Sequence, residues 1–80
     1  MTIRVRRFEW DEANVDHLEL AHPHISLEDL EEIVITASGY VKVRRDRYGK
    51  MVYAASRGAL VVQFNILPGN IVRIFSVHTR

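Results

Sequence analysis

Three histidines near the N-terminus are the first residues whose type suggests chemistry. His17, His22 and His24 offer three imidazoles, and His-x-His is a spacing found among metal ligands. His17 and His22 are five residues apart, however, which does not place them on one face of a helix. The chain also contains no cysteine, which excludes thiolate ligands and thiol nucleophiles. We therefore expect no metal site and no cofactor.

The arginines, lysines and tyrosines of the second half suit a different chemistry, the binding and cleavage of RNA. Cleavage needs no metal if the 2′-hydroxyl attacks the adjacent phosphate. The protein must then position that hydroxyl, transfer a proton and stabilise the charge on the phosphorane. Arginine suits the last task because it stays protonated and binds phosphate through two hydrogen bonds. From the residues alone this chemistry is permitted rather than indicated.

Charge is distributed unevenly along the 80 residues, although the formal net charge is only +1. Residues 9–37 contain nine Asp or Glu and no Lys or Arg, whereas residues 38–80 contain eight Lys or Arg and a single acid, Asp46. This asymmetry predicts a basic surface for a polyanion and an acidic surface for a basic partner. The alternative is that the two halves attract each other within the fold.

The length and composition predict one small domain spanning residues 1–80. A hydrophobic fraction of 48% is typical of globular proteins. No apolar run approaches the roughly 20 residues that span a membrane, and the N-terminus does not resemble a secretory signal. The lack of cysteine fits a reducing compartment. We expect a soluble cytoplasmic protein with no membrane association.

The first half of the chain predicts one short strand and two helices. Residues 2–8 alternate apolar and basic residues, which favours a strand. A helix is expected over residues 11–21, ending before Pro23. Ser26 and Asp29 have the spacing of a capping box, and the residues that follow carry an apolar stripe, so a second helix is expected there.

The second half is rich in β-strand signals. Four segments have the length and composition of strands, namely 40–44, 51–56, 60–67 and 71–77. Short connections such as Pro68-Gly69-Asn70 join antiparallel neighbours, so these segments should form a meander. The predicted fold is therefore of the α+β class. Two N-terminal helices would pack on one face of an antiparallel sheet with four strands, or five with an added strand.

Alternation along the strands divides their residues between two faces of the sheet. The predicted core face contains Val41, Val43, Val52, Ala54, Leu60, Val62, Phe64, Ile66, Val72 and Ile74. The opposite face contains Lys42, Arg44, Tyr53, Arg57, Gln63, Asn65 and Arg73, together with Tyr40, Met51 and Phe75. This second face combines cations with aromatic rings and contains no acid. It favours binding of RNA over an ordinary solvated surface, which usually mixes both signs of charge.

Two stretches of the sequence resemble a known family. Phe8-Glu9-Trp10-Asp11, followed by a polar residue, a His and a helix starting near Ser26, resembles the N-terminal signature of BrnT-type toxins. These are small proteins of bacterial toxin–antitoxin pairs. The stretch GNIVRIFSVHTR, residues 69–80, is similar to the last strand of that family, in which an Arg is followed by alternating apolar residues and a Ser.

The resemblance implies a RelE-like fold and a metal-independent ribonuclease that cleaves mRNA and thereby inhibits translation. It also implies a partner, an antitoxin encoded by the adjacent gene, which usually binds DNA. The toxin would then contact DNA only through that complex. Two alternatives stay open: an inactive relative that binds an antitoxin or another partner, and a small RNA-binding module outside any toxin pair.

The face assignment and the resemblance together select candidate site residues. Arg73, which matches the family's last strand, and Arg57 would stabilise the phosphorane, and Tyr53 or His78 would transfer the proton. His22 is the one residue of the family's Lys-His-Gly motif that this chain retains. The RNA-binding candidates are Lys42, Arg44, Arg45, Arg47, Gln63 and Asn65.

Overall fold

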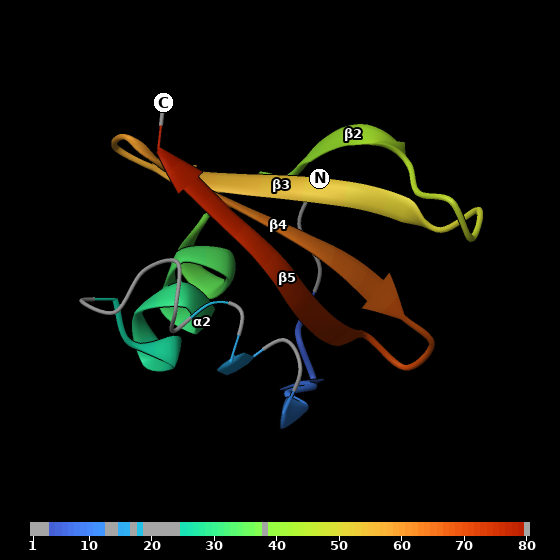
Figure 1. Ribbon diagram of the computed structural model, residues 1–80, viewed down its shortest axis with the longest axis horizontal. Helices are drawn as coiled ribbons and strands as arrows, with labels where there is room; N and C mark the ends of the chain where they lie inside the picture. Colours follow the sequence, from blue (N-terminus) through green and yellow to red (C-terminus); the bar gives the residue numbers. More distant parts are fainter. Residues whose placement is uncertain (1–3, 13–14, 17, 19–24, 38, 80) are drawn as a thin grey trace.

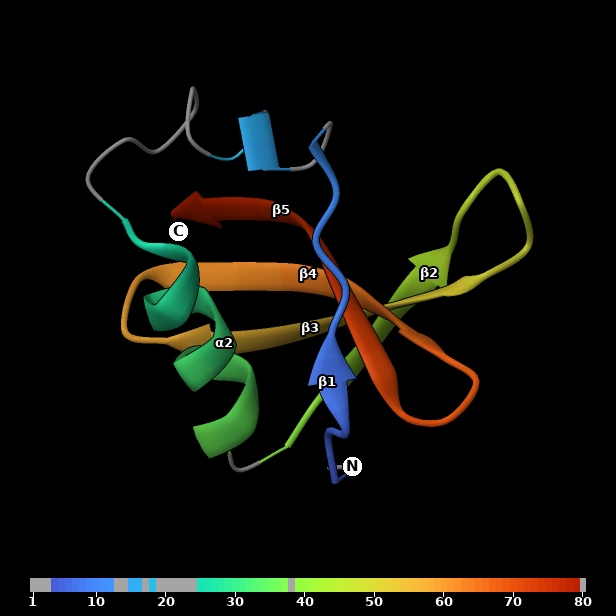
Figure 2. The same cartoon turned by 90° about the horizontal axis from the view of Figure 1, so that it is seen from below.

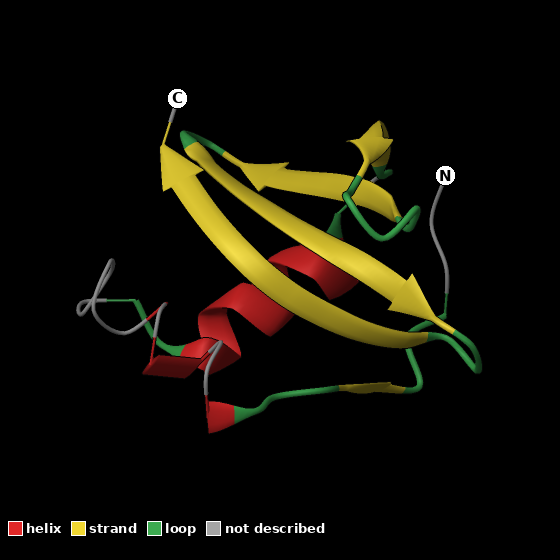
Figure 3. Cartoon of the chain, turned by 45° about the vertical axis from the view of Figure 1, so that its right-hand side comes forward, coloured by secondary structure: helices red, strands yellow, loops and turns green. Residues whose placement is uncertain are grey.

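A five-stranded sheet with a helix on one face forms most of the described chain (Figure 1, Figure 3). The computed structural model describes residues 4–12, 15–16, 18, 25–37 and 39–79. Its elements, in chain order, are β1 (Arg7–Phe8), α2 (Leu27–Thr36), β2 (Val41–Arg45), β3 (Met51–Arg57), β4 (Leu60–Leu67) and β5 (Ile71–Thr79).

The strands lie in the order β1-β5-β4-β3-β2. Strands β2 to β5 form an antiparallel meander, because each is joined to the next by a short turn. The turn between β4 and β5 is the Pro68-Gly69-Asn70 segment expected from the sequence, and Gly69 and Asn70 both have positive φ. Strand β1 comes from the other end of the chain and pairs with β5 in parallel, with Arg7 opposite Ile71 (Figure 2).

The prediction of two helices on an antiparallel sheet of RelE-like type is wrong. The sheet is mixed, and α2 is the one complete helix within the described residues. Most of the first expected helix, residues 11–21, lies outside the described residues. Alternation in residues 2–8 predicts a strand but not its direction. The long connection through α2 returns the chain so that β1 runs parallel to its neighbour.

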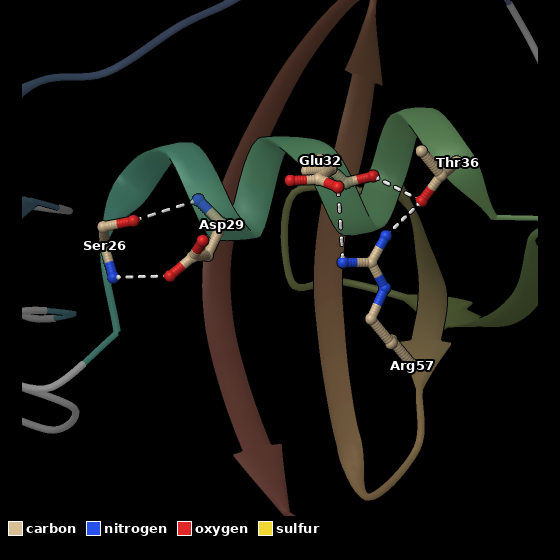
Figure 4. Close-up of polar contacts among 5 residues, drawn as sticks. All are labelled: Ser26, Asp29, Glu32, Thr36 and Arg57. Atoms are coloured by element: carbon tan, nitrogen blue, oxygen red, sulfur yellow. Dashed lines mark hydrogen bonds and ion pairs between the residues drawn. The ribbon is translucent and has the colours of Figure 1, made fainter.

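Helix α2 begins where the sequence predicts. The Ser26 Oγ accepts a hydrogen bond from the Asp29 backbone N–H at 3.1 Å, and the Asp29 carboxylate accepts one from the Ser26 N–H at 3.4 Å (Figure 4). These two bonds form the expected capping box. Leu30, Ile33 and Val34 project from the helix into the core and are buried.

Phe64 lies at the centre of the core and is fully buried. The ring of Tyr40 meets it edge-on with 4.9 Å between ring centroids, and the ring of Tyr53 stacks on it at 6.0 Å. Val62 and Ile74, on the neighbouring parts of β4 and β5, are buried in the same cluster. The core therefore lies between α2 and one face of the sheet, which we call the helix face.

The predicted faces are reversed in β3. Gly58 and Ala59 form a two-residue turn, so Arg57 lies opposite Leu60 and shares its face. Tyr53 likewise lies opposite Phe64. Tyr53, Ala55 and Arg57 therefore lie on the helix face, and Val52 and Ala54, which were expected there, lie on the opposite face.

Two irregularities in strand pairing explain the other differences. The register shifts between Lys42 and Arg44 in β2, leaving Val43 as the extra residue, and Phe75 is the extra residue in β5. Each bulge changes which face the following residues occupy. In β2 the expected core residues Val41 and Val43 are instead 66% and 46% exposed, because nothing among the described elements covers this edge strand.

The described elements pack compactly. The radius of gyration is 11.7 Å, close to the roughly 12 Å expected for a compact chain of this length. No helix in the described ranges is both long and apolar enough to cross a membrane.

Candidate nucleic-acid binding site

A concave pocket of about 570 Å³ lies on the sheet face opposite α2, which we call the pocket face. Strands β2, β4 and β5 contribute to it together with the tip of the β2–β3 hairpin, residues 46–50. The hairpin tip lies at the end of the sheet away from α2 (Figure 1, Figure 2). The lining residues are four cations, two aromatics and three others: Arg44, Arg47, Lys50, Arg73, Tyr48, Phe75, Asp46, Asn65 and Leu67.

The floor of the pocket is built by residues in register across four strands. Arg44 of β2 lies opposite Val52 of β3, and Asn65 of β4 lies opposite Arg73 of β5. Tyr53 of β3 pairs with Phe64 of β4. Val52 precedes Tyr53 and Asn65 follows Phe64, so Val52 and Asn65 lie next to each other on the pocket face. Arg44, Val52, Asn65 and Arg73 thus form a row across four strands, with the two arginines at its ends. The row is three strand spacings long, about 14 Å. A group bound over the centre of this row lies between two guanidinium groups.

The hairpin tip is held in shape by Asp46. Its Oδ1 accepts hydrogen bonds from the backbone N–H groups of Tyr48 at 2.8 Å and Lys50 at 3.0 Å. Its backbone N–H donates to the Lys50 carbonyl at 2.8 Å, and its carbonyl accepts from Gly49, whose φ is +77°. Arg45 donates to the Gly49 carbonyl at 2.9 Å. The single acid among the pocket residues therefore stabilises the conformation of the loop that carries the cations.

Arg47 and Tyr48 form a second contact within the hairpin tip. The Arg47 guanidinium carbon lies 5.4 Å from the centroid of the Tyr48 ring, a cation–π arrangement. Stacked in this way, the two side chains present a charged and an aromatic surface side by side at the edge of the pocket.

Arg73 is the pocket cation that forms ion pairs within the fold. Its Nη1 lies 3.3 Å from Glu9 Oε1, and it also donates to the Asp11 carboxylate. Its side chain is partly exposed, so these pairs contribute modestly to stability. Arg44, Arg47 and Lys50 make no ion pair with any described residue. These three carry the unbalanced positive charge of the pocket.

The segment around Trp10 links the pocket to α2. The Trp10 indole N–H donates to the Glu31 carboxylate of α2 at 2.7 Å, while Glu9 and Asp11 on either side contact Arg73. The Glu9 backbone N–H also continues the pairing with β5, donating to the Val72 carbonyl at 2.8 Å. The Phe-Glu-Trp-Asp stretch therefore positions Arg73 rather than lining the pocket itself.

Two predicted catalytic residues lie on the helix face, away from the pocket. The Arg57 guanidinium donates to the Thr36 hydroxyl and lies 3.7 Å from the Glu32 carboxylate, both on α2 (Figure 4). Tyr53 is half-buried, with its ring stacked on Phe64. Neither Arg57 nor Tyr53 therefore meets Arg73 in one site.

The other candidates divide between the pocket and its surroundings. Arg44, Arg47, Asn65 and Arg73 come together in the pocket. Four other candidates do not line it. His78 is exposed near the end of β5, and Gln63 is half-buried on the pocket face. Lys42 lies on the helix-face side of β2, and Arg45 is hydrogen-bonded within the hairpin. His22 lies outside the described residues.

Sequence reasoning missed Tyr48 and Lys50 as site residues. They lie in the RDRYGK connection between two strands, of which only Arg45 and Arg47 were candidates for RNA binding. That segment contains three cations and a tyrosine within six residues, and this composition was the signal for a binding loop. The ion pairs of Arg73 with Glu9 and Asp11 had no comparable signal, because the partners lie more than 60 residues away in sequence.

Comparisons with protein-family models, with curated proteins and with solved structures give no match. Within the described residues, no three His, Asp or Glu side chains are arranged to hold a metal ion. The composition and geometry of the pocket are therefore the features that bear on its function.

Proposed function

We propose that this protein binds single-stranded RNA in the pocket and cleaves it without a metal ion, as the toxin of a bacterial toxin–antitoxin pair. The observation that carries the proposal is the convergence of Arg44, Arg47 and Lys50, which have no ion pair among the described residues, with the aromatic rings of Tyr48 and Phe75. Cations that hold phosphates and rings that stack on bases are the combination by which proteins bind single strands.

The positions of the two floor arginines support a cleavage site. Arg44 and Arg73 lie on either side of Asn65, so a phosphate between them would meet guanidinium groups from two directions. Such groups stabilise the charge that develops on a phosphorane. Tyr48 and Lys50 are the pocket residues that we assign to proton transfer, in place of Tyr53, which faces α2.

The resemblance to BrnT-type toxins supplies the biological part of the proposal. The substrate would be mRNA in the cytoplasm, and cleavage would inhibit translation. The antitoxin from the adjacent gene would bind the toxin and cover the pocket. Any contact with DNA would be made by the antitoxin.

A matched pair of substitutions on one strand tests RNA binding. Arg44→Ala and Lys42→Ala each remove one positive charge from an exposed residue of β2, but only Arg44 lines the pocket. We expect Arg44→Ala to weaken binding of a short single-stranded RNA about tenfold, the effect of one charge-assisted contact. It should also reduce the salt dependence of log K by about 0.7. Lys42→Ala should change the affinity less than twofold, as measured by fluorescence anisotropy at two salt concentrations.

The same pair of variants tests cleavage in a cell. Induced expression of the wild type should arrest growth and shorten mRNA on a gel of total RNA, and Arg44→Ala but not Lys42→Ala should relieve both effects. Equal loss in the two variants would contradict the pocket assignment. Normal growth and intact mRNA, with RNA binding retained, would contradict the cleavage step and leave an RNA-binding protein.

A second candidate function, binding of a partner protein, is favoured by strand β2. It pairs with β3 on one side only among the described elements, and its exposed Val41 and Val43 are apolar. An open edge of this kind accepts a strand from another chain. Lys42, Arg44 and Arg45 on the same strand favour an acidic partner segment. A strand bound there would lie next to Arg44 and restrict access to the pocket.

A further inference from the structure

Asn65 is a pocket residue for which phosphate binding has no use. It is 8% exposed, and it is the one buried polar side chain among the described residues. Every other residue buried to this degree in the described ranges is apolar or an aromatic of the core. A polar group is held in such a place at a cost unless its hydrogen bonds are made.

The hydrogen bonding of Asn65 is incomplete within the described part of the protein. Its Nδ2 donates to the Met51 carbonyl at 3.0 Å, which fixes the orientation of the amide. Its Oδ1 accepts no hydrogen bond from any described residue. Every side-chain N or O atom that is fully buried among these residues has a partner. The Oδ1 atom is therefore not fully buried, and Asn65 lines the pocket.

An acceptor atom in a cationic pocket selects for a particular kind of ligand. Phosphate offers oxygen acceptors, so the Asn65 Oδ1 contributes nothing to a phosphate bound among the arginines. A ligand that carries an N–H donor beside its phosphate satisfies both features. Each RNA base presents an N–H on an edge that an asparagine amide can bind.

Phe75 supplies the surface that a base would stack on. It is the bulged residue of β5, partly exposed, and it lines the same pocket as Asn65 and Arg73. A bulge redirects a side chain out of the regular alternation of its strand. Stacking on an aromatic side chain favours base binding without selecting which base is bound.

We propose that the pocket binds one nucleotide with its base inserted. Phe75 stacks on the base, the Asn65 Oδ1 accepts a hydrogen bond from a base N–H, and the pocket cations hold the phosphate. Asn65 is then the residue that recognises the base. This inference rests on the proposed RNA-binding function and adds a position at which the base, not only the backbone, contributes to affinity.

The first test uses the wild-type protein and small ligands. A ¹⁵N-labelled sample is titrated with each of the four ribonucleoside 5′-monophosphates and with ribose 5-phosphate, which has the sugar and phosphate but no base. We expect at least one monophosphate to bind about tenfold or more tightly than ribose 5-phosphate. The side-chain amide signals of Asn65 should shift with that nucleotide and not with ribose 5-phosphate.

The second test uses two substitutions on the same strand and face. Asn65→Leu removes the amide at similar volume, and Gln63→Leu makes the same change two residues away, outside the pocket lining. Asn65→Leu should remove the preference for the nucleotide over ribose 5-phosphate, whereas Gln63→Leu should retain it. Thermal unfolding establishes that both variants are folded. If Asn65→Leu does not fold, the wild-type titration decides alone.

The possible failures are distinguishable. Equal binding of nucleotide and ribose 5-phosphate, or no binding of either, would overturn base recognition if the wild type still binds RNA, and would leave the proposed function intact. A retained nucleotide preference in folded Asn65→Leu would overturn the role of Asn65. Absence of RNA binding by the wild type would overturn the proposed function and this inference with it.

Discussion

The Tyr40 hydroxyl connects the end of α2 to the centre of the core. The last carbonyls of a helix have no helical N–H partner, and Tyr40 donates to one of them, the Val34 carbonyl, at 3.0 Å. Its ring meets Phe64 edge-on. One buried side chain therefore completes the helix end and packs against the sheet.

Removing that hydroxyl should destabilise the fold. Tyr40→Phe keeps the ring but leaves the Val34 carbonyl without its donor in a buried site, and we expect the free energy of unfolding to fall by about 1 kcal/mol. Tyr48→Phe is the control, because Tyr48 is 76% exposed and should change stability by less than about 0.5 kcal/mol. Urea unfolding of the three proteins gives both values. Equal stability of Tyr40→Phe and wild type would contradict the assignment.

Ion pairs of single residues within the fold account for part of the charge asymmetry. Arg57 pairs with Glu32, and Arg73 pairs with Glu9 and Asp11, so these basic residues are bound by the acidic half within the fold. The capping box was predictable because its two residues are three apart. These ion pairs were not, because any acid of residues 9–37 was an equally good partner from sequence alone.

The β2–β3 hairpin is the element on which the pocket depends most. Five lining residues come from β2 and the hairpin tip, and the tip is braced by the Asp46 carboxylate. Two effects of this acid on the proposed RNA binding oppose each other. Its charge repels phosphate, whereas its hydrogen bonds hold Tyr48 and Lys50 in position.

Substitution of Asp46 separates those effects. Asp46→Ala removes both the charge and the acceptor, and we expect it to destabilise the tip by about 1 kcal/mol and to weaken RNA binding. Asp46→Asn removes the same charge but keeps an Oδ1 acceptor, so it should bind RNA at least as tightly as the wild type. Anisotropy titrations compare the three proteins. Tighter RNA binding by both variants would mean that only the charge of Asp46 affects the affinity and that its hydrogen bonds within the hairpin tip do not.

At the level of elements, the strands and their meander were predictable, but the face assignment of β3 was wrong. The stretch MVYAAS is apolar at consecutive positions, so alternation does not define its buried face. The turn contained the missing information. Two residues between paired strands place Arg57 opposite Leu60, which assigns Arg57 and Tyr53 to the helix face. The bulges at Val43 and Phe75 have no such local signal, because they depend on packing across strands.

For the whole molecule, the two sides of the meander differ. Strand β1 covers the outer side of β5, whereas β2 has no neighbour beyond it among the described elements. The direction of β1 could not be predicted, because it is set by the path of the whole chain between β1 and β5. The proposed partner site follows from this difference between the two edges.

Substitutions on β2 test that partner site. Val41→Lys with Val43→Lys should abolish binding of the proposed antitoxin, because lysines on an edge strand oppose pairing with another strand. RNA binding should not weaken. Ile35→Lys, the same kind of change at a position of α2 that is 62% exposed, should leave the complex intact. Size-exclusion chromatography of mixtures with the purified partner measures the complex. Retained binding by the double variant would exclude this edge as the docking site.

The pairing of β1 with β5 also determines when the site can exist during synthesis. Arg7 and Phe8 align with Ile71 and Val72, so β1 has no neighbour until the ribosome has made residue 72. The pocket itself requires Phe75 of β5. A nascent chain shorter than 75 residues lacks the stacking ring, and one shorter than 73 residues also lacks Arg73. If the protein cleaves RNA as proposed, a nascent chain therefore has no assembled site with which to cut its own message before the codon for Phe75 is translated.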